Sequence, residues 1–175
     1  MAEKLFISWD DYNSTVEKLA IQIHNSYKPD LLIGIMRGGA PIIDVLSRVF
    51  KIKCAYLAVE SYSGKGIEDK QGKLTFSREM SSTVQNLGGK ILLCDDLSDT
   101  GITLNKSIEW LSKYPPLKGK ITSIKTAVLW KKAKSTFKPD FCAVTLKTNP
   151  WIVQPFERYE EIRIEELKKK HENKG

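Results

Sequence analysis

Hydrophobic residues fall along the chain in two alternating patterns, one with helical spacing and one made of short continuous runs. Ser8 is a residue type that caps helices, and apolar side chains return at helical spacing after it until Ile23. Leu31–Ile35 is an apolar run bounded by breakers, which is typical of a buried parallel strand. Pro41 suits the first turn of a second helix, and Cys54–Val59 predicts another strand. This order is a strand–loop–helix–strand unit, which is almost always right-handed.

The second half of the chain continues the alternation. Ile91–Cys94 predicts a strongly apolar strand, a helix follows it, and Ile121–Leu129 and Phe141–Leu146 predict two more strands. Alternating strands and helices predict an α/β fold of three layers, in which helices flank a mostly parallel central sheet. Ligands of such folds bind at the carboxyl ends of the strands. The loops that leave those ends cover residues 36–40, 95–103 and 131–134.

Residues 60–80 interrupt the alternation with a polar, charged and glycine-containing segment. A segment of this kind in a compact domain predicts a mobile loop or an exposed hairpin, and long loops often act as lids over a site. The rest of the sequence contains no interdomain linker and no internal repeat. We therefore expect one domain over residues 1–175, an ordinary size for a single hydrophobic core.

The hydrophobic fraction and the net charge limit the kinds of partner that the protein can have. The hydrophobic fraction of 41% excludes a disordered chain, and the net charge of +7 is compatible with nucleic acid or with a small anionic substrate. Much of the excess lies in the last eight residues, where a solvated helix face is the preferred interpretation. No DNA- or RNA-binding signature accompanies this charge, so nucleic acid is not the expected partner. The lysines concerned are Lys168, Lys169, Lys170 and Lys174.

The three cysteines, Cys54, Cys94 and Cys142, are widely spaced and lie in apolar runs. This spacing indicates neither a disulfide framework nor a metal site, and it favours buried thiols in a reducing compartment. The N-terminal residues lack the apolar core of a secretion signal, and no segment approaches the ~20 apolar residues of a membrane span. We therefore expect a cytoplasmic protein that has no membrane partner.

The string ILLCDDLSDTGITL carries the clearest chemistry, because its apolar strand ends in the carboxylates of Asp95 and Asp96. Thr100, Gly101 and Thr103 come just before a helix, whose first N–H groups and nearby hydroxyls bind phosphate. The carboxylates would repel phosphate, and they suit instead the hydroxyls of a ribose or a hydrated Mg²⁺. A ribose 5-phosphate satisfies both halves of the string. The Gly-Lys-Ser/Thr of a Walker loop is absent, so NTPase chemistry is not supported.

This string resembles the motif by which type I phosphoribosyltransferases bind 5-phosphoribosyl 1-pyrophosphate (PRPP). In that motif a hydrophobic run, two acidic residues, a short spacer and Asp-Thr-Gly-x-Thr follow one another. The resemblance extends over nearly the whole chain. It implies the type I phosphoribosyltransferase fold, with a small base-binding hood built from the N-terminal segment and residues 147–165. The PRPP-binding residues that it implies here are Asp95, Asp96, Asp99, Thr100, Gly101, Ile102 and Thr103.

Three further segments resemble parts of the family's PRPP site. The loop after the first core strand matches the pyrophosphate loop, which often contains a non-proline cis peptide, here at Met36–Arg37; a plain tight turn is the alternative. Ser61-Tyr62 resembles the pair that opens the flexible catalytic loop of hypoxanthine-guanine enzymes. Arg163 matches a position near the pyrophosphate, and a surface helix charge is its alternative. Together these segments supply Met36, Arg37, Gly38, Gly39, Ser61, Tyr62 and Arg163.

The segment WIVQPFE resembles the part of 6-oxopurine enzymes that recognises the base. Trp151 would stack on the purine, a contact that contributes ~1–3 kcal/mol, and the carbonyl of Ile152 would meet the 2-position; a core role is the alternative for Trp151. A lysine at the end of the preceding core strand should donate to the purine O6. We prefer Lys131 over the adjacent Lys132. A 6-amino group would need an acceptor there, so the lysine argues against adenine.

The resemblance implies transfer of 5-phosphoribosyl from PRPP to N9 of guanine, xanthine or hypoxanthine, which gives a nucleoside monophosphate and pyrophosphate in purine salvage. Mg²⁺ is the implied cofactor, and Asp95, Asp96 and Glu157 are its implied contacts. Asp99 is the implied catalytic base, which accepts the proton of purine N7. The family also implies a homodimer or homotetramer. The sequence does not rank the three 6-oxopurines.

Three alternatives remain at this point. The first is a PRPP-sensing regulator that binds nucleic acid, and the second is a phosphoribosyltransferase for adenine, uracil or orotate. The third is a non-catalytic scaffold, which the intact Asp95, Asp96 and Asp99 disfavour.

Overall fold

The computed structural model describes residues 3–61 and 74–172. These residues belong to two compact units. We call Thr15–Asn149 the sheet unit and Met1–Ser14 with Pro150–Gly175 the terminal unit. The terminal unit draws on the two segments predicted to form the hood. The single domain over residues 1–175 stays a prediction.

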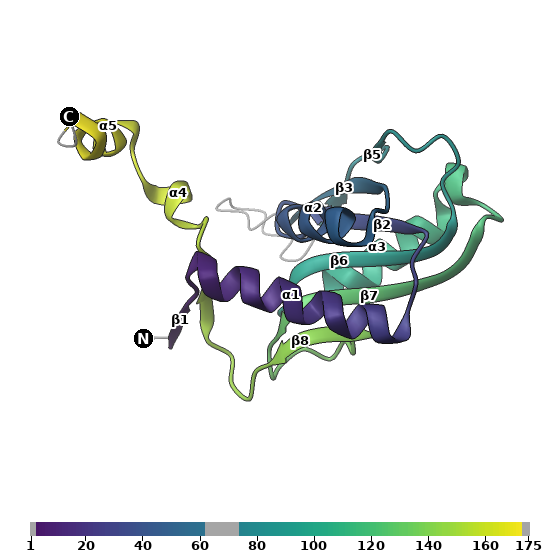
Figure 1. Cartoon of the computed structure of the whole chain (residues 1–175), viewed down its shortest axis with the longest axis horizontal. Helices are drawn as coiled ribbons and strands as arrows, with labels where there is room; N and C mark the ends of the chain where they lie inside the picture. The colour runs from purple at the N-terminus through teal and green to yellow at the C-terminus, as the bar shows by residue number, and fades with distance from the viewer. Residues whose placement is uncertain (1–2, 62–73, 173–175) are drawn as a thin grey trace, which may run out of the picture. The chain divides into compact units, whose positions relative to one another are not determined.

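A mostly parallel sheet forms the middle of the sheet unit (Figure 1), which confirms the predicted fold class. Its strands follow the order β4-β3-β2-β6-β7-β8, and β5 pairs with β3. The contacts β2–β3, β2–β6, β6–β7 and β7–β8 are parallel, whereas β4 and β5 pair antiparallel with β3. The strands are β2 (Leu31–Met36), β3 (Cys54–Ser61), β4 (Leu74–Phe76), β5 (Ser81–Ser82), β6 (Gly89–Ser98), β7 (Ile121–Lys131) and β8 (Phe141–Thr145).

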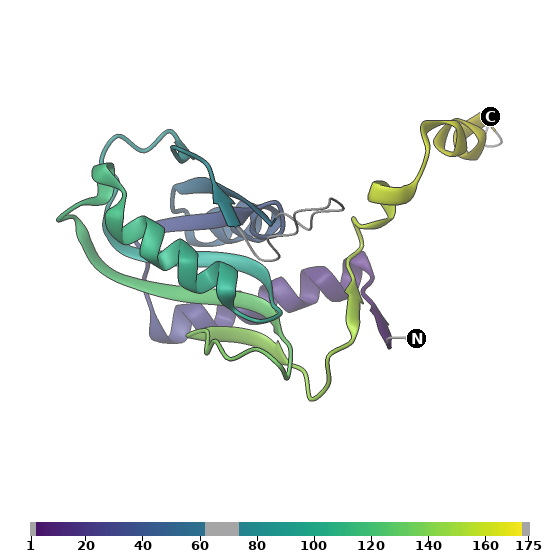
Figure 2. The same ribbon diagram turned by 180° about the vertical axis from the view of Figure 1, so that it is seen from behind.

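Helices cover both faces of this sheet, which explains why β2 is apolar at nearly every position. Within the sheet unit, α1 and α2 lie on one face and α3 lies on the other (Figures 1 and 2). Leu31, Ile33 and Ile35 join a buried cluster with Leu104 and Leu111 of α3. The helices are α1 (Trp9–Ser26), of which Thr15 onward belongs to the sheet unit, α2 (Gly39–Phe50) and α3 (Ile102–Lys113), followed by the 3₁₀ turn η1 (Pro115–Leu117).

The predicted boundaries differ from the structure at β6 and at the polar segment. β6 continues through both carboxylates to Ser98, because β7 keeps pairing with it as far as Lys131. Asp95 and Asp96 therefore lie in the strand and not in the loop after it. The polar segment contributes β4, which pairs antiparallel with β3, but this strand is partly buried because Phe76 packs against the core cluster. Residues 62–73 of that segment, which include Tyr62, lie outside the described residues.

The terminal unit is built on a two-stranded parallel sheet of β1 (Lys4–Phe6) and β9 (Trp151–Val153). Trp9 and Tyr12 of α1 contact the ring of Phe156 at centroid distances of 6.4 and 6.0 Å. Ser8 caps α1 as predicted, since its hydroxyl accepts the N–H of Asp11 at 3.0 Å. The unit also contains the short helices α4 (Arg158–Glu161) and α5 (Ile164–Glu172).

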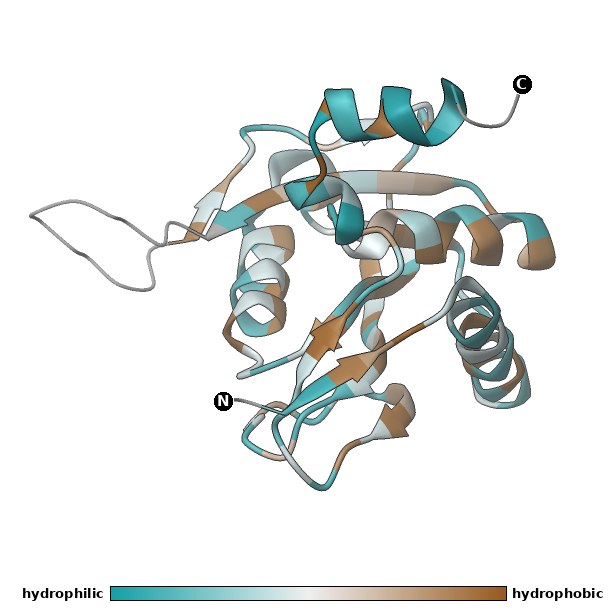
Figure 3. Ribbon diagram, turned by 90° about the vertical axis from the view of Figure 1, so that its left-hand side faces the viewer, coloured by the Kyte–Doolittle hydropathy of each residue, from teal (hydrophilic) through white to brown (hydrophobic). Residues whose placement is uncertain are grey.

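The C-terminal lysines and the three cysteines differ in how far they are exposed. α5 buries none of its residues and is hydrophilic over most of its circumference (Figure 3), which confirms the solvated face for Lys168, Lys169 and Lys170. Lys174 lies outside the described residues. All three cysteines are free thiols. Cys94 is buried as predicted, but Cys54, at the start of β3, and Cys142, on the edge strand β8, are partly exposed. Across the described ranges, no helix is both long and apolar enough to cross a bilayer.

Candidate functional site

The loop after β2 lies directly against the end of β6. The Met36–Arg37 peptide is cis, as predicted, and both side chains are exposed. A Cβ atom on Gly38 would overlap the carboxylate of Asp96, and one on Gly39 would overlap the backbone carbonyl of Cys94. Glycine is therefore required at Gly39 because two backbones approach closely there, whereas a side chain at Gly38 would have to displace the Asp96 carboxylate. A plain tight turn would not explain this contact.

Asp95 and Asp96 form an acidic pair at the end of β6. Asp95 is 9% exposed, Asp96 is partly buried, and the Asp96 N–H donates to Asp95 Oδ1 at 3.0 Å. Burial raises the pKa of Asp95, and the neighbouring Asp96 charge raises it further. Ionisation of the Asp95 carboxyl is therefore unfavourable in the ligand-free protein.

Asp95→Asn should make the ligand-free protein more stable by about 1–3 kcal/mol near neutral pH, because it removes this buried charge. The amide oxygen can still accept the Asp96 N–H. Since the pKa of Asp95 is raised in the folded state, its contribution to stability is highest at low pH and is lost as the pH rises through that pKa. Thermal unfolding of both proteins across a pH series measures the gain, which should grow with pH. A lower melting temperature for the variant at every pH would contradict it.

Asp99, which follows β6, is held by two lysines. Lys132 Nζ lies 2.7 Å from Oδ1, and Lys134 Nζ lies 2.8 Å from Oδ2. Burial alone would raise the pKa of Asp99, but the hydrogen bonds and charges of the two lysines outweigh it and lower that pKa. We call these three residues the Asp99 clamp. Its two lysines differ, because the Lys132 side chain is 7% exposed and that of Lys134 is 46% exposed.

The segment 132–137, which follows β7, supports the loop around Asp99 along its length. The Lys132 N–H donates to the Ser98 carbonyl at 3.1 Å, and the hydroxyls of Ser98 and Ser135 lie 2.7 Å apart. The Thr136 N–H donates to the Thr100 carbonyl at 3.3 Å. These bonds fix the backbone on both sides of Asp99.

The predicted phosphate cradle begins at Gly101, whose φ is +90°, in the left-handed region that favours glycine. A Cβ atom there would also overlap Phe137, so the segment after β7 closes against this turn. α3 starts at Ile102, which is exposed; Thr100 is exposed and Thr103 partly buried. The Ile102 N–H donates to Thr100 Oγ1 at 3.4 Å, so this hydroxyl lies at the start of the helix. The arrangement suits an anion at a helix N-terminus.

The structure distinguishes the two candidate lysines. Lys131 is the last residue of β7 and pairs with Ser98 and Thr145 of the neighbouring strands. Lys132 follows it, and its ammonium lies on Asp99. The contact of Lys131 with a purine stays a prediction. Sequence reasoning missed the clamp, although a run of lysines at the carboxyl end of a strand was a signal for it.

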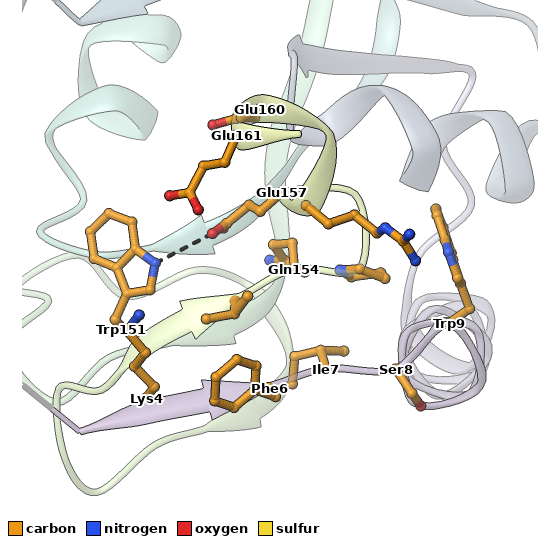
Figure 4. A pocket seen from close by; sticks show the side chains of 13 residues that line it. Lys4, Phe6, Ile7, Ser8, Trp9, Trp151, Gln154, Glu157, Glu160 and Glu161 are labelled. Carbon is orange, nitrogen blue, oxygen red and sulfur yellow. Dashed lines mark hydrogen bonds between the residues drawn. The ribbon is translucent and has the colours of Figure 1, made fainter. Parts of the chain in front are cut away.

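Within the terminal unit, Trp151 is 56% exposed, so the alternative of a core tryptophan is wrong. Its indole N–H donates to Glu157 Oε2 at 3.3 Å (Figure 4), which orients the ring. Ile152 is 4% exposed and lies in β9 beside Leu5. A cavity of about 1100 Å³ opens on this unit. Its lining includes Lys4, Phe6, Trp9, Trp151, Gln154 and Glu157.

The remaining predicted residues fall outside these clusters. Arg163 is exposed and lies between α4 and α5 in the terminal unit, where its carbonyl accepts the Glu166 N–H at 3.0 Å. Ser61 ends β3, and Tyr62 lies outside the described residues. The roles of these residues at a pyrophosphate or in a closing loop stay predictions.

The acidic pair fits Mg²⁺ through the kind of ligands it offers. Among the described residues, no group of three His, Cys, Asp or Glu side chains could hold a metal ion. Mg²⁺ is usually bound through one or two carboxylates, waters and substrate phosphates, and does not need an all-protein cage. Asp95 and Asp96 supply such carboxylates in the sheet unit, whereas Glu157 belongs to the terminal unit.

Comparisons with known proteins agree with this geometry. A sequence profile of the phosphoribosyl transferase domain matches residues 8–161. The hypoxanthine-guanine phosphoribosyltransferase of Aquifex aeolicus (strain VF5) is 30% identical over 118 residues, which cover 65% of this chain and 64%, less than two thirds, of that protein. The hypoxanthine-guanine-xanthine phosphoribosyltransferase of Tritrichomonas foetus is 24% identical over 165 residues, 92% of this chain and 87% of that protein. A purine phosphoribosyltransferase structure from Pyrococcus horikoshii Ot3 has a TM-score of 0.70 at 27% identity and covers 93% of this chain and 97% of that one.

Proposed function

The chain belongs to the phosphoribosyl transferase domain family, and from this membership we propose that it transfers 5-phosphoribosyl from PRPP to N9 of a 6-oxopurine. The products are a nucleoside monophosphate and pyrophosphate, as in purine salvage. Relatives named for hypoxanthine and guanine support the base class. The observation that carries the proposal is the contact of the Gly38-Gly39 backbone with the Cys94–Asp96 end of β6, next to the start of α3.

Each group in the sheet unit has a role in this reaction. The carboxylates of Asp95 and Asp96 accept hydrogen bonds from the two ribose hydroxyls, and their charge favours the cation that develops at C1. Residues 100–103 bind the 5-phosphate at the start of α3. The loop at residues 36–39, which the close contact of Gly39 holds against β6, binds the pyrophosphate.

The reaction exchanges one bond at C1 for another. The C1–O bond to pyrophosphate breaks, and the leaving group departs with the electron pair. N9 of the purine forms the new bond, while Asp99 accepts the proton on N7 and so keeps the base neutral. Holding both substrates in place supplies much of the rate, and exclusion of water protects C1 from hydrolysis.

Mg²⁺ belongs to the same proposal, with Asp95 and Asp96 as the residues that would hold it. When bound, it would neutralise charge on the pyrophosphate as that group leaves. The homodimer or homotetramer, the cytoplasmic location and the contact of Glu157 with the metal are further parts of the proposal, supported by the family resemblance alone.

Lys132→Met should raise the KM of guanine about tenfold or more, whereas Lys131→Met should change it less than threefold. This expectation assigns the purine O6 to Lys132 in place of Lys131, which was preferred from the sequence. The reason is that O6 and N7 are neighbours on one edge of a purine, and the Lys132 ammonium already lies at the carboxylate assigned to N7. Losing one charge-assisted hydrogen bond to the base corresponds to about 1.5–3 kcal/mol, which is roughly 10–150-fold. Steady-state kinetics of the two variants gives the comparison. The reverse order of effects would return the O6 contact to Lys131.

A spectrophotometric assay with PRPP and Mg²⁺ tests the proposed function itself. Guanine, xanthine, hypoxanthine and adenine are offered separately to the purified protein. Turnover of one or more 6-oxopurines, with adenine inert, is the expected result. Turnover of adenine alone would overturn the base assignment. No turnover of any base, with PRPP still bound, would favour a PRPP-sensing regulator.

A further inference from the structure

The Asp99 clamp occupies both oxygens of the carboxylate that should act as a base. Lys132 lies on Oδ1 and Lys134 lies on Oδ2, at ion-pair distances of 2.7 and 2.8 Å. A carboxylate accepts a proton through one of its oxygens, so at least one oxygen has to become available when a purine binds. The reaction assigned to Asp99 therefore requires a change in this clamp.

The two lysines are not equally able to leave. The Lys132 side chain is 7% exposed, so its ammonium has little access to water that could replace Asp99, and breaking a buried ion pair is strongly unfavourable. Lys134 is 46% exposed, so its ammonium can exchange Asp99 for water at little cost. Oδ2 is therefore the oxygen that becomes available.

Hydrogen bonds hold the backbone around Lys134, whereas its partly exposed side chain is free to change rotamer. The Lys134 N–H donates to Asn149 Oδ1 at 2.7 Å, and the next residue, Ser135, is tied to Ser98. The position from which the side chain reaches Asp99 is thus set by the fold. Of the described residues, the charged groups that act on the Asp99 carboxylate are Lys132 and Lys134, both from the segment after β7.

We propose that Lys134 is a positioning residue, which holds Oδ2 of Asp99 in the free protein and releases it when the purine N7–H arrives. The proposal rests on the proposed function for its second half, the release. Its first half concerns the ligand-free protein alone. A surface lysine without this role would neither hold the Asp99 carboxylate in the free protein nor affect purine binding.

Three variants test the proposal. Lys134→Gln removes the charge, Lys134→Arg keeps it, and Lys138→Gln is the matched control, since Lys138 is an exposed lysine of the same connection between β7 and β8. In the free protein, an NMR titration follows the Asp99 carboxyl. Because Lys134 stabilises the ionised form, Lys134→Gln should titrate at a higher pH than the wild type, and the other two variants should match the wild type.

Kinetics of nucleotide formation gives the second readout. Lys134→Gln should lower the KM of the base about 1.4–5-fold, because an exposed ion pair of about 0.2–1 kcal/mol no longer competes with the purine. Asp99 must be ionised to act, so the acid limb of the kcat/KM profile should move to higher pH by the same amount as the titration. Lys134→Arg should keep the wild-type profile.

The outcomes separate this proposal from the proposed function. If the wild-type protein turns over no base, the function fails, and the titration of the free protein still decides whether Lys134 holds Asp99. If Lys134→Gln titrates like the wild type and keeps its KM, Lys134 does not position Asp99. A Lys134→Arg variant that behaves like Lys134→Gln would equally overturn the proposal, since charge would not be what holds the carboxylate.

Discussion

Asp99→Asn should lower kcat for nucleotide formation by about 10²–10⁴-fold, while the Kd of PRPP changes only a few-fold. An amide cannot accept the N7 proton, so N9 would have to attack while the base becomes cationic. The amide oxygen can still accept a hydrogen bond from one lysine of the clamp, so the loop around it should keep its shape. Single-turnover kinetics and calorimetric titration with PRPP measure the two quantities.

Asp44→Asn is the control for this substitution, because Asp44 is an exposed carboxylate on α2 that also pairs with a cation, Arg48. Its kcat should equal that of the wild type. Thermal unfolding of Asp99→Asn shows whether the fold is intact, which separates a lost proton acceptor from a lost structure. Full activity of a folded Asp99→Asn protein would remove Asp99 from the role of catalytic base.

Gly39→Ala should weaken PRPP binding by about 100-fold and lower the stability of the protein by about 1–3 kcal/mol. The new Cβ atom would overlap the backbone carbonyl oxygen of Cys94, which belongs to the central strand β6 and cannot turn away as a side chain can. The loop that begins the pyrophosphate site must then move away from the acidic pair. Calorimetric titration with PRPP and thermal unfolding give the two values.

Gly119→Ala is the matched glycine control. A Cβ atom at Gly119 would meet no atom within 4 Å, but its φ of +72° disfavours alanine by about 1–2 kcal/mol. This residue precedes β7, at the end of the strand opposite the Asp99 clamp. The control should lose stability and keep PRPP affinity. If Gly39→Ala also kept its PRPP affinity, the loop at residues 36–39 would not belong to the PRPP site.

The strand and loop positions of the sheet unit followed from the sequence because burial on both faces leaves continuous apolar runs such as Leu31–Ile35. The same reasoning placed Asp95 and Asp96 at the correct end of the sheet. The sequence prediction ended β6 too early, because two adjacent acidic residues are not typical of a buried strand. Pairing continues to Ser98 because β7 extends alongside β6 as far as Lys131.

The pattern of residue types along the sequence could not predict which side chains contact each other. Nothing in the spacing of Lys131, Lys132 and Lys134 shows which ammonium reaches Asp99, because the answer depends on how the chain turns after β7. Trp151 was predicted to stack on a purine, and its ring is exposed in the structure. The hydrogen bond from its indole to Glu157 was not foreseen. Glu157 had been assigned to Mg²⁺ by resemblance, and that role remains a prediction beside the contact that the structure shows.

The parallel pairing of β1 with β9 has a consequence for how the protein is made. β1 is translated before the sheet unit, but its partner at Trp151–Val153 is translated only after the whole sheet unit. At ordinary translation speeds the delay is on the order of 10 s, during which the sheet unit has time to fold. The loops at residues 36–39 and 95–103 can thus be complete in the nascent chain before Trp151 and Ile152, which are proposed to contact the purine, have been synthesised.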